Sequence, residues 1–288
     1  MTQRAAREPY TTRFETEVTA IDGRSVWLET SYFFGASGGQ PADHGTIGDI
    51  AVTDVRLDGS EQVHVLAEEP SFKPGHRVLC SIDWSFRMYC MRAHTASHVL
   101  YGAAVRSLEE EPAYAGLEIS EETVGVTLEA GSIDDETLIE LDELLNRVVW
   151  ESRPVSWEDV PISSARERDE IGFDEERTPD AIEKGRVRVV SIGDNNDNGN
   201  GGALPSARDT WDVTACSGTH VRNTREVGPV TVLGRSATES GLTRIELAVG
   251  PRAIERRAAE KRAVFAATRA LDVDIDGIPD ELDRLDTR

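Results

Sequence analysis

Short alternating runs of hydrophobic and polar residues fill the first third of the chain. Such alternation is typical of strands with one buried face, and Asp22-Gly23 and Asp58-Gly59 mark turns between them. Residues 33–45 (FFGASGGQPADHG) are too rich in glycine to form a strand. We therefore predict a small β-barrel-like domain over residues 1–85. Its expected strands are residues 13–20, 25–28, 50–57 and 61–66.

From about residue 85 the hydrophobic period changes to that of helices. Apolar residues recur at helical spacing over residues 86–108, and a second helix is expected to begin at Ser132. The second helix places four apolar residues on one face: Leu138, Leu141, Leu145 and Val148. Strands are expected over residues 118–128 (a pair with a turn at Glu121-Glu122), 186–192, 227–233 and 244–249. This order predicts an α+β fold with an antiparallel sheet over residues 86–250.

The rest of the chain is more polar. Residues 251–270 have a charged helical pattern and residues 282–285 a shorter one, so we assign residues 251–288 to a C-terminal helical tail. Residues 195–202 (NNDNGNGG) are expected to be a mobile loop. No apolar run approaches the roughly 20 residues of a membrane span, and the start of the chain lacks the apolar core of a signal peptide. We expect a cytoplasmic protein that binds no membrane.

The charge balance favours a cytoplasm with a high salt concentration. The chain has 53 acidic against 31 basic residues, a net charge of −22, and only three lysines (Lys73, Lys184, Lys261). An ordinary acidic protein is the alternative. In molar salt the Debye length is only about 3 Å, so this net charge does not exclude an RNA partner.

Two motifs supply metal-binding side chains. His94 and His98 are four residues apart in a predicted helix, close enough for both imidazoles to reach one ion. Cys216 and His220 are also four apart, with Gly218 between them for a tight turn. Alone, the histidine pair could be chance, and the second pair could be a buried cysteine and a surface histidine. Together they predict one Zn²⁺ per chain, because thiolate and imidazole ligands favour zinc. No Glu follows His94, so the HExxH motif of metalloproteases is absent.

The same segments carry a family resemblance. HTASH (94–98) and CSGTHVRNTREVG (216–228) resemble signatures of the alanyl-tRNA synthetase editing domain and its free-standing relatives. Residues 33–45 resemble the GGQ segment of the preceding domain, which favours the alanyl branch over the threonyl one. RVRVVSIG (186–193) and Arg244-Ile245-Glu246 followed by Gly250 match further landmarks. The resemblance covers about residues 10–270, with Ala93 and Ser217 as departures that remove no ligand.

The resemblance implies an enzyme that hydrolyses an ester. Its substrate would be the acceptor end of tRNA(Ala) carrying serine or glycine by mistake, and no ATP would be needed. Zinc would either activate a water or, with four protein ligands, only order the pocket. The alternatives are a zinc-stabilised tRNA-binding module without catalysis and a hydrolase of small esters or peptides. The oligomeric state is not predicted.

Gln40 is the candidate pocket residue outside the metal motifs. Gly38 and Gly39 would let the backbone approach the substrate, and the Gln40 amide could bind an ester or a ribose hydroxyl. A structural turn is an equally good interpretation. With His94 and His98, Gln40 completes the expected catalytic residues.

Three other side chains could contact the substrate: Thr30, Thr219 and Arg244. Strand packing is the alternative for both threonines, and a surface ion pair is the alternative for Arg244.

Overall fold

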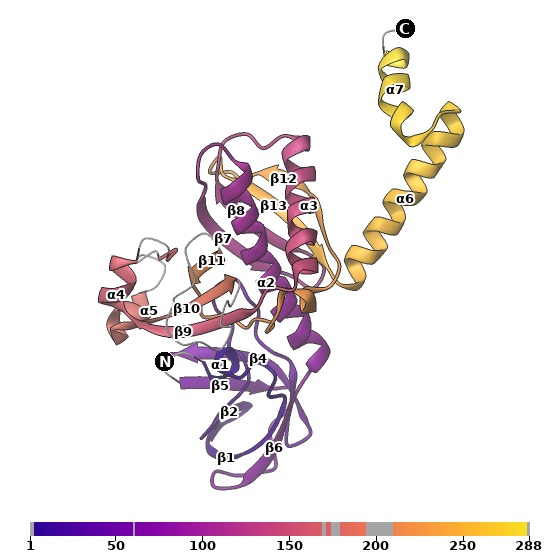
Figure 1. Cartoon of the computed structure of the whole chain (residues 1–288). Coiled ribbons are helices and arrows are strands. Elements are labelled where there is room, and N and C mark those ends of the chain that lie inside the picture. The colour runs from indigo at the N-terminus through magenta and orange to yellow at the C-terminus, as the bar shows by residue number, and fades with distance from the viewer. Residues whose placement is uncertain (1–2, 60, 169–170, 174–178, 194–209, 287–288) are drawn as a thin grey trace.

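The computed structural model describes residues 3–59, 61–168, 171–173, 179–193 and 210–286. A barrel of the first strands lies at one end, and a body of two sheets and two long helices lies above it in the view of Figure 1. Helix α6 (Pro251–Leu271) runs away from this body. The α+β class predicted from the sequence is confirmed.

Six antiparallel strands close the barrel in the order β1-β2-β5-β4-β3-β6. They are β1 (Arg13–Asp22), β2 (Ser25–Leu28), β3 (Gly45–Ile47), β4 (Ile50–Asp58), β5 (Glu61–Leu66) and β6 (Arg77–Ile82). In β6, Val78, Cys80 and Ile82 fill the barrel core while the residues between them are exposed. The four predicted strands are confirmed, whereas β3 and β6 were not predicted. β3 has only three residues, too few for alternation to show.

A four-stranded antiparallel sheet with the order β12-β13-β8-β7 forms the larger core. Its strands are β7 (Ala113–Ile119), β8 (Val124–Glu129), β12 (Val230–Ala237) and β13 (Thr243–Val249). Helices α2 (Trp84–Ser107) and α3 (Asp135–Glu151) pack against it and against each other. The strand expected over residues 227–233 begins only at Val230, because η1 (Thr224–Val227) is a 3-10 helix capped by the Asn223 side chain.

A three-stranded antiparallel sheet, β11-β10-β9, flanks this core. It contains β9 (Val155–Pro161), β10 (Arg186–Gly193) and β11 (Thr210–Ala215), with the short helices α4 (Ile162–Glu167) and α5 (Pro179–Lys184) beside it. Only β10 was predicted. β9 exposes Ser156, Trp157 and Glu158 in succession, so its sequence shows no period of two.

The C-terminal segment is helical, as expected, with α6 followed by η2 (Ile275–Gly277) and α7 (Ile278–Asp286). The polar loop expected over residues 195–202 lies outside the described residues. Among the described helices, none combines the length and the apolar character that crossing a membrane requires. The two boundaries between the three expected domains stay a prediction.

A buried ion pair joins the barrel to α2. Arg87 of α2 and Asp43 of the segment after the GGQ tripeptide are both almost fully buried, and Arg87 Nε donates to Asp43 Oδ1 at 2.9 Å. The Arg87 guanidinium also donates to the carbonyl oxygens of Pro9 and Tyr32, each at 2.8 Å. Asp43 in turn accepts a hydrogen bond from the backbone N–H of Phe34. One arginine therefore fixes α2 relative to three separate segments.

Candidate metal centre

The middle of α2 presents two buried histidines, His94 and His98, on one face. They are one helical turn apart, so both imidazoles leave the helix on the same side. Ala93 and Ala96 are buried beside them. This part of the helix therefore lies in the interior of the body, where side chains have little freedom.

The loop after β11 brings Cys216 and His220 to the same place. Gly218 between them is required, because a Cβ at this position would overlap the imidazole of His94. Arg188 of β10 fixes the loop, since its Nη1 donates to the carbonyl oxygens of Cys216 at 2.8 Å and Gly218 at 3.1 Å. The tight turn expected between Cys216 and His220 is thus held in place by these hydrogen bonds.

The four side chains converge. One ligand atom from each of His94, His98, Cys216 and His220 lies within 4.8 Å of the other three. Cys216 Sγ is 3.3 Å from Nε2 of His94 and 3.3 Å from Nε2 of His220. Sulfur and nitrogen ligands of tetrahedral zinc lie about 3.5 Å apart when their bonds have the usual lengths. The donor set and its spacing fit one zinc ion.

Each imidazole is oriented through its second ring nitrogen. Nδ1 of His94 donates to Gln40 Oε1 at 3.0 Å, and Nδ1 of His98 donates to Asp212 Oδ2 at 2.6 Å. The hydroxyl of Thr95 donates to a backbone carbonyl, so its oxygen accepts from Nδ1 of His220 at 3.2 Å. Such partners orient metal-binding histidines, so that Nε2 is the nitrogen directed at the ion.

The electrostatics of the cluster favour a thiolate. Burial opposes ionisation of Cys216, but the imidazoles of His94 and His220 hold the pKa of its thiol well below the usual value. Burial also lowers the pKa of His98, yet the Asp212 carboxylate outweighs it and raises that pKa to about 10. Burial lowers the pKa of His220 to about 3. The thiol of Cys90, four residues before His94, has its pKa raised by burial to about 12 and is not part of the cluster.

Gln40 lies behind the cluster rather than in an open pocket. Gly38 and Gly39 have positive φ angles of 58° and 80°, and Ser37 and Gln40 exchange backbone hydrogen bonds across this two-residue turn. The Gln40 side chain is buried, and its Nε2 donates to Thr219 Oγ1 at 2.9 Å. Its Oε1 accepts from His94 and from the backbone N–H of Thr219.

The close backbone approach expected at the glycines is to the protein itself. A Cβ at Gly39 would overlap the carbonyl of Leu117 in β7. The structure thus brings Gln40 and Thr219 to the cluster as orienting groups. It does not bring Thr30 or Arg244 there. The backbone N–H of Thr30 donates to Thr16 Oγ1 of the barrel, and Arg244 pairs with Glu118 at 2.8 Å on the four-stranded sheet. Contact of these residues with a substrate stays a prediction.

Sequence reasoning missed Asp212 and Thr95. Asp212, Thr214 and Cys216 alternate along and just after β11, and Asp212 also accepts from the Thr214 hydroxyl. That period of two could have pointed to Asp212 if the strand had been predicted. Thr95 lies inside the HTASH motif itself, one residue after His94.

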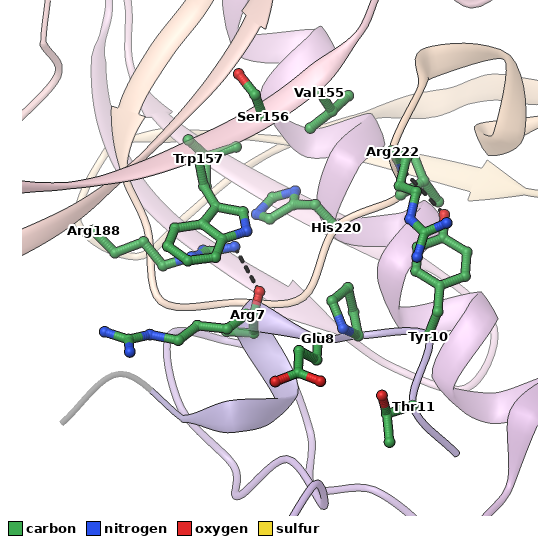
Figure 2. Close-up of a pocket in the computed structure, with 14 residues that line it drawn as sticks. Arg7, Glu8, Tyr10, Thr11, Val155, Ser156, Trp157, Arg188, His220 and Arg222 are labelled. Carbon is green, nitrogen blue, oxygen red and sulfur yellow. Dashed lines mark hydrogen bonds between the residues drawn. The ribbon is translucent and has the colours of Figure 1, made fainter. Parts of the chain in front are cut away.

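A cavity of about 420 Å³ opens beside the cluster (Figure 2). His220 belongs both to the cluster and to the cavity wall. The other walls come from the N-terminal segment, β9, β10 and Arg222. A volume of this size is within the usual range of small-molecule sites.

Asp212→Asn should weaken zinc binding. An amide cannot balance the charge of a metal-bound imidazole as a carboxylate does, and loss of such a partner costs about 10–100-fold in metal affinity. Competition against a chromophoric chelator measures this affinity. Asp135→Asn, at an exposed carboxylate that pairs with Arg235, is the matched control and should leave it unchanged. An Asp212→Asn affinity within twofold of the wild type would show that the contact is not needed.

The chain is similar in sequence to parts of tRNA synthetases. The sequence model of one protein family, the threonyl and alanyl tRNA synthetase second additional domain, matches residues 187–246. The alanine–tRNA ligase of Pyrococcus abyssi is 33% identical over 283 residues, which are 96% of this chain and 29% of the ligase. Those of Aeropyrum pernix (33% over 262 residues; 88% and 27%) and Methanothrix thermoacetophila (32% over 277 residues; 94% and 28%) are similar too. The chain spans less than a third of the length of these relatives.

Proposed function

Because this chain is a relative of the alanyl-tRNA synthetase editing domain, we propose that it hydrolyses the ester bond of tRNA(Ala) charged with serine or glycine. The observation that carries the proposal is the convergence of three imidazoles and one thiolate beside a cavity. The partner would be the acceptor end of the tRNA, and the reaction would need no ATP.

Zinc held by His94, His98, Cys216 and His220 would supply Lewis-acid chemistry at an ester carbonyl or at a water. The protein's own groups have separate tasks. Gln40 and Asp212 orient the imidazoles of His94 and His98. Burial of the three histidines limits the access of bulk water, which strengthens the electrostatic interaction of the cluster with a bound ester. In this proposal Gln40 is a positioning residue for His94.

Such an enzyme is needed because a synthetase cannot select its amino acid with sufficient accuracy by binding alone. A synthetase pocket built for alanine cannot strongly reject glycine, which is smaller, and rejects the added hydroxyl of serine poorly. A second hydrolytic site corrects both errors. It must spare alanine, whose side chain offers no hydrogen bond to polar groups in the pocket.

The test is deacylation of Ser-tRNA(Ala), Gly-tRNA(Ala) and Ala-tRNA(Ala) side by side. We expect at least one of the first two to be cleaved much faster than Ala-tRNA(Ala). Free serine esters serve as the control for a general esterase and should be cleaved far more slowly. Equal cleavage of all three tRNAs, or of none, would overturn the proposal.

One observation favours a second candidate, a tRNA-binding module without catalysis. Four protein ligands would fill a tetrahedral zinc site, as they do in structural sites. Under this alternative the chain binds tRNA(Ala) with zinc present and leaves the ester intact. The same deacylation assay, run at protein concentrations that saturate binding, separates the two.

We propose further that the protein works at high salt. Its net charge is −22, so its acidic side chains repel one another at low ionic strength, and salt screens that repulsion. The melting temperature should therefore rise steadily between 0.1 M and molar KCl, a change that calorimetry measures. A melting temperature that is independent of KCl concentration would contradict this proposal and indicate an ordinary acidic protein.

A further inference from the structure

The cavity beside His220 combines arginines with aromatic side chains. Figure 2 shows its walls: the N-terminal segment from the end of α1 (Arg4–Arg7) onward, strands β9 and β10, and the loop that carries His220. Six lining side chains carry the argument: Arg7, Tyr10, Trp157, Arg188, His220 and Arg222.

The cavity is basic although the chain is strongly acidic. Three arginines line it against a single acidic residue, Glu8. Arg7 pairs with Asp159 at 2.6 Å, but within the described part of the chain no carboxylate pairs with Arg222. Arg222 instead lies over the ring of Tyr10, 4.0 Å from its centroid. Its guanidinium keeps its donors for an anion, and phosphate is the anion that an arginine fork fits best.

Aromatic surface accompanies this charge. Trp157 is 39% exposed and lines the cavity. In Figure 2 its ring lies on the cavity side of β9, with His220 close by. The guanidinium groups of Arg188 and Arg7 lie over this ring, 5.3 Å and 5.8 Å from its centroid. Aromatic rings combined with arginines form the usual platform for an unpaired base.

Arg188 couples the cavity to the metal cluster. Its side chain is buried, and its Nη2 donates to the carbonyl oxygen of Ala6 at 2.9 Å, while Nη1 holds the loop of Cys216 and Gly218. Its Nε has no hydrogen-bond partner among the described residues. Buried donors are almost always paired in proteins, so a water or a ligand that enters the cavity is its expected partner.

We propose that this cavity binds the 3′-terminal nucleotide of the RNA strand. The base stacks at Trp157, the phosphate lies at Arg222, and the ribose faces His220. An ester on that ribose then reaches the cluster, because His220 belongs to both sites. The assignment rests on the proposed function and adds the side chains that hold the nucleotide.

The test is calorimetric titration of the full-length, zinc-loaded protein with the RNA trinucleotide CCA. Trp157→Ala and Arg222→Ala are compared with Trp150→Ala, an 85% exposed tryptophan of α3, and with Arg225→Ala, an exposed arginine of η1. Loss of base stacking on one aromatic ring should raise Kd about 5- to 150-fold in Trp157→Ala. Arg222→Ala should raise it similarly, and both controls should match the wild type. Trp157→Phe keeps an aromatic face and should restore most of the affinity.

Two further probes separate the parts of the ligand. The affinity for adenosine 5′-monophosphate should depend on both Trp157 and Arg222, whereas the affinity for inorganic phosphate should depend on Arg222 alone. CCA binding that is the same in Trp157→Ala as in Trp150→Ala would overturn the assignment.

The kinetics keep this inference distinct from the proposed function. On Ser-tRNA(Ala), Trp157→Ala should raise KM with kcat little changed, since it removes binding that substrate and transition state share. If the wild type hydrolyses the ester and neither variant changes KM, the nucleotide site is wrong and the function stands. If CCA binds through Trp157 but no ester is cleaved, the function is wrong and the site stands.

Discussion

Cys216→Ser is expected to remove zinc from the protein and to abolish deacylation of Ser-tRNA(Ala). A serine hydroxyl does not ionise near neutral pH, so the cluster loses its only anionic ligand. Loss of a residue that only orients a ligand costs about 10–100-fold in metal affinity. Loss of a ligand itself should lower the zinc affinity by more than that. Elemental analysis after gel filtration gives zinc per chain, and kcat/KM gives the catalytic loss.

Cys90→Ala is the matched control for this variant. Cys90 is buried in the same helix as His94 but stands outside the cluster. Its removal should leave one zinc per chain and near-normal kcat/KM, with some loss of stability. A Cys216→Ser protein that keeps one tightly bound zinc would contradict the assignment of this ligand.

Asp43→Ala is expected to destabilise the fold by about 3–5 kcal/mol, because it leaves the buried guanidinium of Arg87 without its counter-ion. Urea unfolding followed by circular dichroism measures the change in free energy of unfolding. Asp54→Ala, at the exposed pair with Arg56, should cost less than about 1 kcal/mol.

A double variant shows whether the charge is responsible. Asp43→Leu combined with Arg87→Met replaces both charges with apolar side chains and should be more stable than Asp43→Ala. Equal destabilisation would assign the effect to packing around Asp43 and contradict the electrostatic account. Asp43 follows Gln40 by three residues, so Asp43→Ala should also disturb the contact between Gln40 and His94.

The metal ligands could be predicted because each pair has a short, regular spacing. His94 and His98 lie on one helical face, and Cys216 and His220 flank a glycine that a tight turn requires. Their partners could not be predicted in the same way. Asp212 lies on a strand whose six residues carry a weak pattern, and Gln40 reaches His94 from 54 residues away. Only the tertiary fold relates them.

The sequence identified the GGQ motif, but it did not predict that the Gln40 side chain orients His94. The glycines correctly indicated a tight turn, but the turn faces β7 and the amide faces His94. The nucleotide cavity was not foreseen at all. Tyr10, Trp157 and Arg222 come from three distant segments, and no local period connects them.

Removal and restoration of zinc tests the central claim most directly. Protein stripped with a chelator and freed of it should no longer deacylate Ser-tRNA(Ala), and one equivalent of zinc should restore the activity. Circular dichroism should confirm that the stripped chain stays folded. A folded, zinc-free protein that deacylates Ser-tRNA(Ala) at the full rate would contradict the claim that these four side chains hold the ion on which hydrolysis depends.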